Sequence, residues 1–219
     1  MKKLLVVSLL TCLATGVFAF DLSAGGGVTV GSFSSTYYYE DIGPIDSLRE
    51  RSCTVPFAIS GYFDATYALA AIGFRANGNT RTSYKIVSGG TTTYPAPSDD
   101  HYAWGFLSFS VLGKYPFAVG PVTIFPLAGI EYDAILYRHD ETGATLSTEG
   151  LGQFWFRIGA GSDITVYRNL YIRPIALFGL KLLNADEKKK VQDTLDAGAS
   201  LARITDFAFD GGVQVGWRF

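Results

Sequence analysis

The stretch FAFDGGVQVGWRF, residues 207–219, decides which fold we expect for this chain. Every second residue from Phe207 to Phe219 is apolar or glycine, and the residues between them are small, polar or charged. Because successive side chains of a β-strand point to opposite faces, this alternation predicts a strand with one apolar and one polar face. Trp217 falls on the apolar face, and Asp210 and Arg218 fall on the polar one. Such a strand needs a different environment on each side.

The same alternation recurs in seven earlier segments. The predicted strands are residues 20–31, 55–63, 67–76, 101–115, 122–136, 153–166 and 170–183. Residues 34–53, 77–100, 137–150 and 184–203 are long polar connections, and the three connections between them are short. This rhythm is typical of a transmembrane β-barrel with both chain ends in the periplasm. We predict an all-β fold, an eight-stranded antiparallel up-and-down barrel with four long extracellular loops and three short periplasmic turns.

An eight-stranded β-sandwich is the alternative fold, and it would show the same alternation. It does not explain the unequal loop lengths or the small share of charged residues, which is 17% of the chain against about 25% in soluble domains. No apolar run after residue 20 is long enough for a spanning helix, and a membrane protein without one must be a closed barrel. Within the fourth long loop, Asn184 and Glu187 have the spacing of a capping box, which indicates a short helix.

The first nineteen residues resemble an export signal in composition. Lys2 and Lys3 precede an apolar segment, and Val17-Phe18-Ala19 supplies small residues where a signal peptidase cuts. We predict a signal peptide over residues 1–19 and a single barrel domain over residues 20–219. Lipoprotein processing at Cys12 is the alternative.

Without Lys2 and Lys3, the formal net charge changes from -2 to -4, which argues against a nucleic-acid partner. Cys53 is then the one cysteine left, so no intramolecular disulfide can form.

The final strand resembles the C-terminal strand of bacterial outer-membrane barrels, which carries a terminal Phe after alternating apolar residues. The resemblance implies that the barrel-assembly machinery recognises Val213, Val215, Trp217 and Phe219. The whole architecture resembles the outer membrane protein W and outer membrane protein A barrel-domain superfamily. It implies a location in the outer membrane of a diderm bacterium, with outer-membrane lipid as a partner.

Charged residues are predicted to fill much of the barrel interior. An eight-stranded barrel has room inside for side chains or for one small ligand. The alternation directs both signs of charge inward, so we expect ion pairs, because an unpaired buried charge is costly. They form either a polar core or the wall of a narrow polar path. The predicted charge network is Asp21, Arg75, Glu131, Asp133, Arg157, Asp163, Arg173, Lys181, Asp210 and Arg218.

Apolar residues are predicted to line a chamber near the long loops. Its candidate members are Tyr102, Trp104, Phe106, Leu127, Trp155 and Leu177, together with Ile135 and Ile175. Such a chamber resembles that of the outer membrane protein W family, which implies passage of small apolar molecules through a lateral opening. Alternatively these residues belong to the interfacial aromatic girdle, because a one-residue register slip reverses every side chain of a strand.

The residues offer little for catalysis. After residue 20 the histidines are His101 and His139, and neither has the neighbours of a known hydrolase motif. We expect no enzyme activity, no cofactor and no metal site. The favoured function is a narrow channel or carrier for small, hydrophobic solutes. The alternatives are a surface-exposed adhesin or binding protein that recognises host ligands through its loops, for which Tyr37 to Tyr39 are candidates, and a purely structural barrel.

Overall fold

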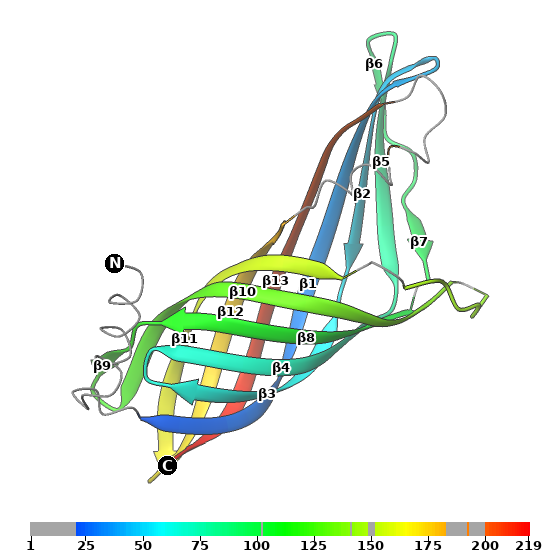
Figure 1. The fold of residues 1–219 in the computed structure, drawn as a ribbon. Helices are drawn as coiled ribbons and strands as arrows, with labels where there is room; N and C mark the ends of the chain where they lie inside the picture. The colour runs from blue at the N-terminus through cyan, green and yellow to red at the C-terminus, as the bar shows by residue number, and fades with distance from the viewer. Residues whose placement is uncertain (1–20, 102, 141, 149–151, 183–191, 193–199) are drawn as a thin grey trace, which may run out of the picture.

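Eight antiparallel strands close into a barrel in the computed structural model (Figure 1). Each strand pairs with the next, and the last pairs with the first, so the all-β closed barrel predicted from the sequence is confirmed. The barrel strands are β1 (Leu22–Ile42), β3 (Phe57–Ala65), β4 (Ala68–Asn77), β8 (Ala103–Lys114), β10 (Val122–His139), β11 (Gln153–Tyr167), β12 (Leu170–Leu182) and β13 (Ser200–Arg218).

The structure describes residues 21–101, 103–140, 142–148, 152–182, 192 and 200–219. The predicted signal peptide lies outside these residues, as does most of the segment for which a short helix was expected. Within the described residues, no helix has the length and apolar character needed to cross a membrane.

The two ends of the barrel differ in the length of their connections. At one end, here called the turn end, β3 joins β4 through a two-residue turn and β11 joins β12 through Arg168 and Asn169. The connection from β8 to β10 is also short and contains β9 (Phe117–Val119), which pairs with the start of β10. Ser23 pairs with Arg218 at this end. The four long connections lie at the opposite end, here called the loop end.

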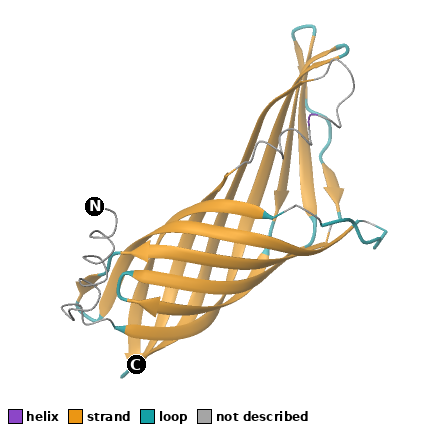
Figure 2. Ribbon diagram, in the orientation of Figure 1, coloured by secondary structure: helices purple, strands orange, loops and turns teal. Residues whose placement is uncertain are grey.

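A sheet rises from the loop end beyond the barrel (Figures 1 and 2). The outer part of β1 pairs with β13 on one side and with β2 (Ile45–Thr54) on the other. β5 (Thr80–Ser88) pairs with β2, and the short strands β6 (Thr91–Thr93) and β7 (Ser98–Asp100) pair with β5. We call this five-stranded array of β13, β1, β2, β5 and β6 the loop-end sheet.

The loop-end sheet corrects the prediction that residues 34–53 and 77–100 are loops. Both segments are polar, yet they are rich in Ser, Thr and Tyr, which form strands readily in water when a neighbouring backbone is available to pair with. Their hairpins turn at Gly43 and at Gly89 and Gly90, all of which have positive φ angles that suit glycine. β13 likewise begins at Ser200, within the predicted fourth loop.

Large apolar side chains cover the outer face of the barrel. Ile130, Phe156 and Val215 are 55%, 42% and 49% exposed, and residues of the same kind lie on every barrel strand. Tyr67, Tyr115 and Phe117 form a chain of aromatic contacts at the turn end, with ring centroids 6.3 and 5.0 Å apart. Charged and polar side chains face inward instead, so the barrel has the reverse of the polarity of a water-soluble fold.

Candidate functional site

The barrel interior contains ionic and apolar layers that alternate along its axis. A first ion cluster lies at the turn end, an apolar layer follows, and a second ion cluster lies near the middle. An ion pair near the loop end completes the series. Four of the largest interior side chains, Trp155, Arg157, Tyr171 and Arg173, are almost completely inaccessible to solvent.

The turn-end ion cluster is centred on Arg173 of β12. Its Nε and Nη2 donate to the two carboxylate oxygens of Asp163 at 2.6 and 3.0 Å, and Nη2 also contacts Asp64. Lys114 Nζ lies 2.6 Å from Asp64 Oδ2, and Arg218 Nη2 lies 3.6 Å from Asp163 Oδ2. Side chains from five strands therefore meet in one network.

Two tyrosines cross the barrel beside this cluster. Tyr62 OH donates to Tyr171 OH at 2.9 Å, and Ser23 Oγ lies 2.8 Å from the same phenol. Gly25 and Gly216 make room for them, because a Cβ on either glycine would come within 2.5 Å of Tyr62 OH. The guanidinium of Arg173 lies 4.8 Å from the centroid of the Tyr62 ring, so the aromatic faces also stabilise its charge.

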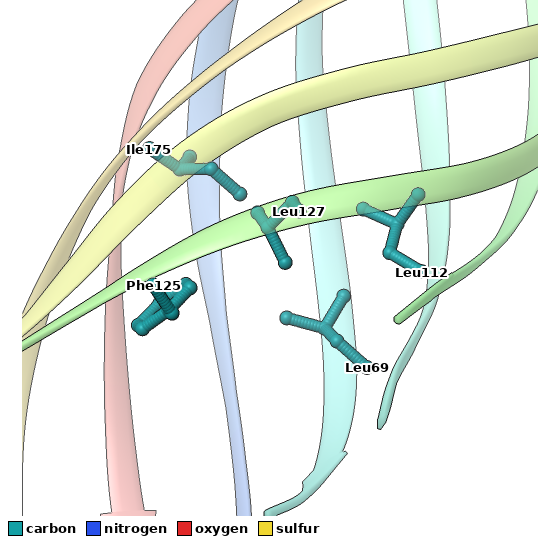
Figure 3. Packing of buried hydrophobic residues seen from close by; sticks show 5 residues of the cluster. All are labelled: Leu69, Leu112, Phe125, Leu127 and Ile175. Atoms are coloured by element: carbon teal, nitrogen blue, oxygen red, sulfur yellow. The ribbon is translucent and has the colours of Figure 1, made fainter. Parts of the chain in front are cut away.

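An apolar layer lies between the two ion clusters. Five side chains from β4, β8, β10 and β12 pack together there (Figure 3). Ala71 and Leu177 lie against them. Phe125 is completely buried, and its ring occupies the space that a side chain at Gly161 would need. The layer therefore packs side chains of four strands together inside the barrel at this level. Its five residues are Leu69, Leu112, Phe125, Leu127 and Ile175.

The central ion cluster joins two arginines to three carboxylates. Arg75 lies 3.2 Å from both Glu131 and Asp133 and 3.4 Å from Asp210. Arg157 Nε donates to Glu131 Oε1 at 3.2 Å, and its Nη1 lies 2.9 Å from Asp210 Oδ2. Ser108 Oγ donates to Asp133 Oδ1 at 2.5 Å. Both arginines thus hold the same two acidic groups in place.

Nearer the loop end, Lys181 Nζ lies 3.2 Å from Asp206 Oδ2, and Ser35 Oγ donates to the same carboxylate. Lys181 and Asp206 are both buried. The ion pair links β12 to β13, and the hydrogen bond from Ser35 links β1 to the same group. These contacts lie at the level where the loop-end sheet begins.

Nine of the ten residues of the predicted charge network occupy these three groups. Asp21 is the correction: it is exposed at the turn end, before β1 begins, and only its backbone N–H is bonded, to Thr66 Oγ1. The predicted network omitted Asp64, Lys114 and Asp206. Asp64 lies just beyond the predicted strand 55–63, although it continues the inward alternation of Tyr62, and Lys114 lies near the end of the predicted strand 101–115.

The described residues of the predicted apolar chamber do not form one group, which is a second correction. Leu127 and Leu177 belong to the apolar layer or pack against it, on the turn-end side of the central ion cluster. Trp155 makes an edge contact with Phe33, and Trp104 stacks on Phe106, both on the loop-end side. Tyr102 lies outside the described residues. Inward-facing apolar residues were foreseen, but strand alternation alone does not show how strands are staggered against each other.

The residues of the predicted assembly signal lie on the outer face of β13 and just after it. Val213, Val215 and Trp217 are about half exposed, and Phe219 is 78% exposed. The two histidines lie at the loop end, and their rings contact different residues. His101 Nδ1 is 2.7 Å from Asn79 Oδ1, and His139 Nδ1 is 3.4 Å from Thr145 Oγ1.

The loop-end sheet has an aromatic surface that continues the inward-facing side of the barrel wall. Two rows of paired residues make up this surface. Tyr37 of β1, Glu50 of β2 and Tyr84 of β5 form the first row. Tyr39, Leu48 and Ile86 of the same strands form the second. The rings of Tyr37 and Tyr39 stack with centroids 6.2 Å apart. We call these six half-buried residues the tyrosine face.

Two groups of the tyrosine face have altered acidity. The pKa of Tyr39 is raised to about 12. Burial is the largest cause, and the nearby Glu50, Tyr37 and Tyr84 add to it. The hydroxyl of Tyr39 therefore remains protonated and able to donate a hydrogen bond. Burial and then the carboxylate of Asp100 raise the pKa of Glu50 above its ordinary value.

Comparisons with known proteins identify barrels of the same general kind and no family. No family description matches the sequence, and no curated protein matches it. Neisserial surface protein A is 11% identical with a TM-score of 0.45, covering 88% of this chain and 97% of that one. The outer membrane protein OprG of Pseudomonas aeruginosa is 10% identical with a TM-score of 0.44, covering 92% and 96%. At these values the likeness says nothing about what this chain binds.

Proposed function

We propose that this protein is an integral outer-membrane barrel that holds the loop-end sheet above the membrane and binds a partner through its tyrosine face. The observation that carries the proposal is the contrast between the two parts of the molecule. The barrel is filled with interlocked side chains, whereas the loop-end sheet extends a patterned surface beyond it.

The distribution of apolar side chains supports a place in the membrane. A closed barrel leaves no unpaired strand edge, and its outer face presents Val, Ile, Leu and Phe on every strand. The aromatic contacts of Tyr67, Tyr115 and Phe117 lie at the turn end, where an interfacial girdle is expected. In this orientation the loop-end sheet lies outside the cell.

The filled interior favours a binding role over the channel or carrier that the sequence analysis placed first. A solute would have to pass the apolar layer and two ion clusters, each of which contains a fully buried arginine, Arg157 or Arg173. Opening such a path would separate several buried ion pairs at once, and each charge left without its partner would cost several kcal/mol.

The composition of the tyrosine face suits recognition. Tyrosine offers a large apolar ring and a polar hydroxyl with few rotatable bonds, so ordering it on binding costs little entropy. Strand pairing on both sides holds Tyr37 and Tyr39 in register with β2 and β13, so the surface is rigid before any ligand arrives.

Binding to immobilised extracellular-matrix proteins tests this proposal, with the full chain displayed on cells or in proteoliposomes. Tyr37→Ala combined with Tyr39→Ala should lower binding about tenfold or more, as loss of aromatic anchors does at other interfaces. Tyr38→Ala is the matched control, because Tyr38 lies between them in sequence and on the opposite face. If the wild type binds no matrix protein, or if the double variant binds equally well, the proposed role is wrong.

A further inference from the structure

The surface opposite the tyrosine face carries a row of cations. Arg203 of β13 lies opposite Tyr38 of β1, Tyr38 lies opposite Arg49 of β2, and Arg49 lies opposite Lys85 of β5. Directly paired residues share a face of a sheet, so three basic side chains and one phenol form a single row across four strands. Arg51, two residues from Arg49, lies on the same side. We call Tyr38, Arg49, Arg51, Lys85 and Arg203 the basic face.

These cations lack acidic partners in the described part of the chain. Arg49 lies over the ring of Tyr38 at 5.5 Å, and Arg51 donates to Ser34 Oγ at 3.2 Å and lies near the ring of Phe207. No described carboxylate forms an ion pair with Arg49, Arg51, Lys85 or Arg203, whereas the interior cations Arg75, Lys114, Arg157 and Arg173 all have such partners. The same surface also carries Glu40 and Asp99, and Asp99 lies 4.0 Å from Arg81.

The basic face continues the apolar outer surface of the barrel. Val28 and Val30 alternate outward along β1, and Tyr38 falls on the same side of that strand. Phe207 marks the transition: its ring stacks on Phe178 of the barrel at 6.3 Å and lies 6.0 Å from the guanidinium of Arg51. The cations therefore begin where the lipid-facing apolar residues end, and they point sideways in the same direction.

Their height above the apolar band matches the headgroup region. Strands rise about 3.4 Å per residue, so the row of Arg51 lies about 7 Å and the row of Arg49 about 14 Å along the strand beyond the row of Phe207. Barrel strands tilt by about 40°, which shortens that height, and arginine side chains extend toward the nearest polar layer. The headgroup layer adds roughly 5 to 7 Å to each side of the hydrocarbon core.

From this arrangement we propose that the basic face binds the phosphate groups of lipids in the surrounding outer leaflet. Arginine forks are suited to phosphate, and Tyr38 adds a hydroxyl donor within the row. The proposal rests on the membrane placement proposed above but not on ligand binding by the tyrosine face. Its effect is to surround the base of the loop-end sheet with selected lipid and to fix the depth of the barrel.

Electron paramagnetic resonance with spin-labelled lipids tests the proposal. The full chain is reconstituted in phosphatidylcholine vesicles containing a trace of either spin-labelled phosphatidic acid or spin-labelled phosphatidylcholine. The fraction of each label immobilised at the protein surface gives the preference for the phosphate headgroup. We expect the wild type to prefer phosphatidic acid and the preference to fall in high salt. Removal of each arginine should weaken it by up to about fivefold, the effect of one basic residue at an anionic lipid surface.

The variants are Arg49→Gln with Arg203→Gln, the conservative pair Arg49→Lys with Arg203→Lys, and Arg168→Gln at the turn end. The glutamine pair should lose the preference, while the lysine pair and Arg168→Gln should keep most of it. Equal preference in the glutamine pair and the wild type would overturn the proposal. So would binding of soluble inositol hexakisphosphate by a wild type that shows no lipid preference, since the site would then serve a soluble anion.

The phosphatidylcholine label shows whether a negative result contradicts the lipid-binding proposal or the membrane placement. If neither label is immobilised, the barrel is not inserted and the placement itself fails. If both labels are immobilised equally by the wild type, the barrel is inserted and the inference about the basic face is wrong. Should the glutamine pair fail to fold, the salt dependence of the wild type and the lysine pair still decide the outcome.

Discussion

Arg157 of β11 reaches Asp210 of β13 across the intervening strand β12, with Nη1 2.9 Å from Oδ2. The residue of β12 that pairs with Arg157 is Gly179, and a Cβ there would come 2.5 Å from Arg157 Nη1. The absence of a side chain at one position therefore permits an ion pair between strands that are not neighbours.

Gly179→Ala should destabilise the barrel by about 1–3 kcal/mol, the usual cost of forcing extra volume into a packed interior. The added methyl group must displace the arginine and disturb its contacts with Glu131 and Asp210. Urea unfolding of the protein in lipid vesicles measures the change. Gly61→Ala is the matched control, because its Cβ would meet nothing closer than 3.8 Å. Equal stability of the two variants would contradict the role given to Gly179.

Arg157→Met should cost more, about 3–5 kcal/mol, because Glu131 and Asp210 lose a partner while they remain buried. Adding Glu131→Leu should recover part of that loss, since Arg75 then serves the two remaining carboxylates, Asp133 and Asp210. The same urea titration compares the single and double variants. A double variant less stable than Arg157→Met alone would show that the cluster does not act as a charge-balanced unit.

Proteoliposomes of the wild type should retain small solutes, because the buried apolar layer and two ion clusters lie in the barrel interior. Phe125→Ala combined with Leu112→Ala removes two of its buried side chains and should make the vesicles leak a trapped fluorescent dye or ions. Phe109→Ala with Val111→Ala, which changes the outer face of β8 instead, is the control. Rapid leakage through the wild type would favour the channel over the binding role.

The stability of the loop-end sheet should depend on the protonation of Glu50. Burial and Asp100 raise its pKa, so the folded sheet favours the protonated acid. The resulting stabilisation is complete below the ordinary pKa of 4.5 and is lost as pH rises through the raised pKa. Amide hydrogen exchange in β2 and β5, corrected for the intrinsic exchange rate, should therefore show stronger protection at acidic than at neutral pH.

Glu50→Gln should remove this pH dependence and keep the protection at neutral pH. Asp99→Asn changes an exposed carboxylate on the other face and is the control. If Glu50→Gln responds to pH as the wild type does, another group controls the sheet.

The sequence predicted the barrel strands well because lipid and a polar interior impose opposite demands on alternate residues. β11 begins at the predicted Gln153 and ends one residue beyond the predicted boundary, and β12 matches as closely. Within the predicted strand 67–76, Arg75 faces inward as expected, and Leu69 faces inward as part of the apolar layer.

The loop-end sheet could not be predicted in the same way, since each of its faces mixes polar with aromatic residues and no lipid boundary imposes an alternation on it. The partners of each interior charge depend on the stagger between strands. Arg173, for example, meets Asp64, which is 109 residues away, on a strand that is not adjacent in the barrel. The residue pattern of a single strand contains no information about such an ion pair between two strands.

The shared strands of the two parts also determine how the molecule would bear load. β1 and β13 both run from the turn end into the loop-end sheet and stay paired from Ser23 and Arg218 to Glu40 and Ser200, with one register shift between Tyr38 and Tyr39. A pull on one of these strands at the far end of the sheet would load that long ladder of hydrogen bonds in shear, with many bonds resisting together. In the proposed placement, tension applied outside the membrane would pass along continuous backbone into the wall of the barrel.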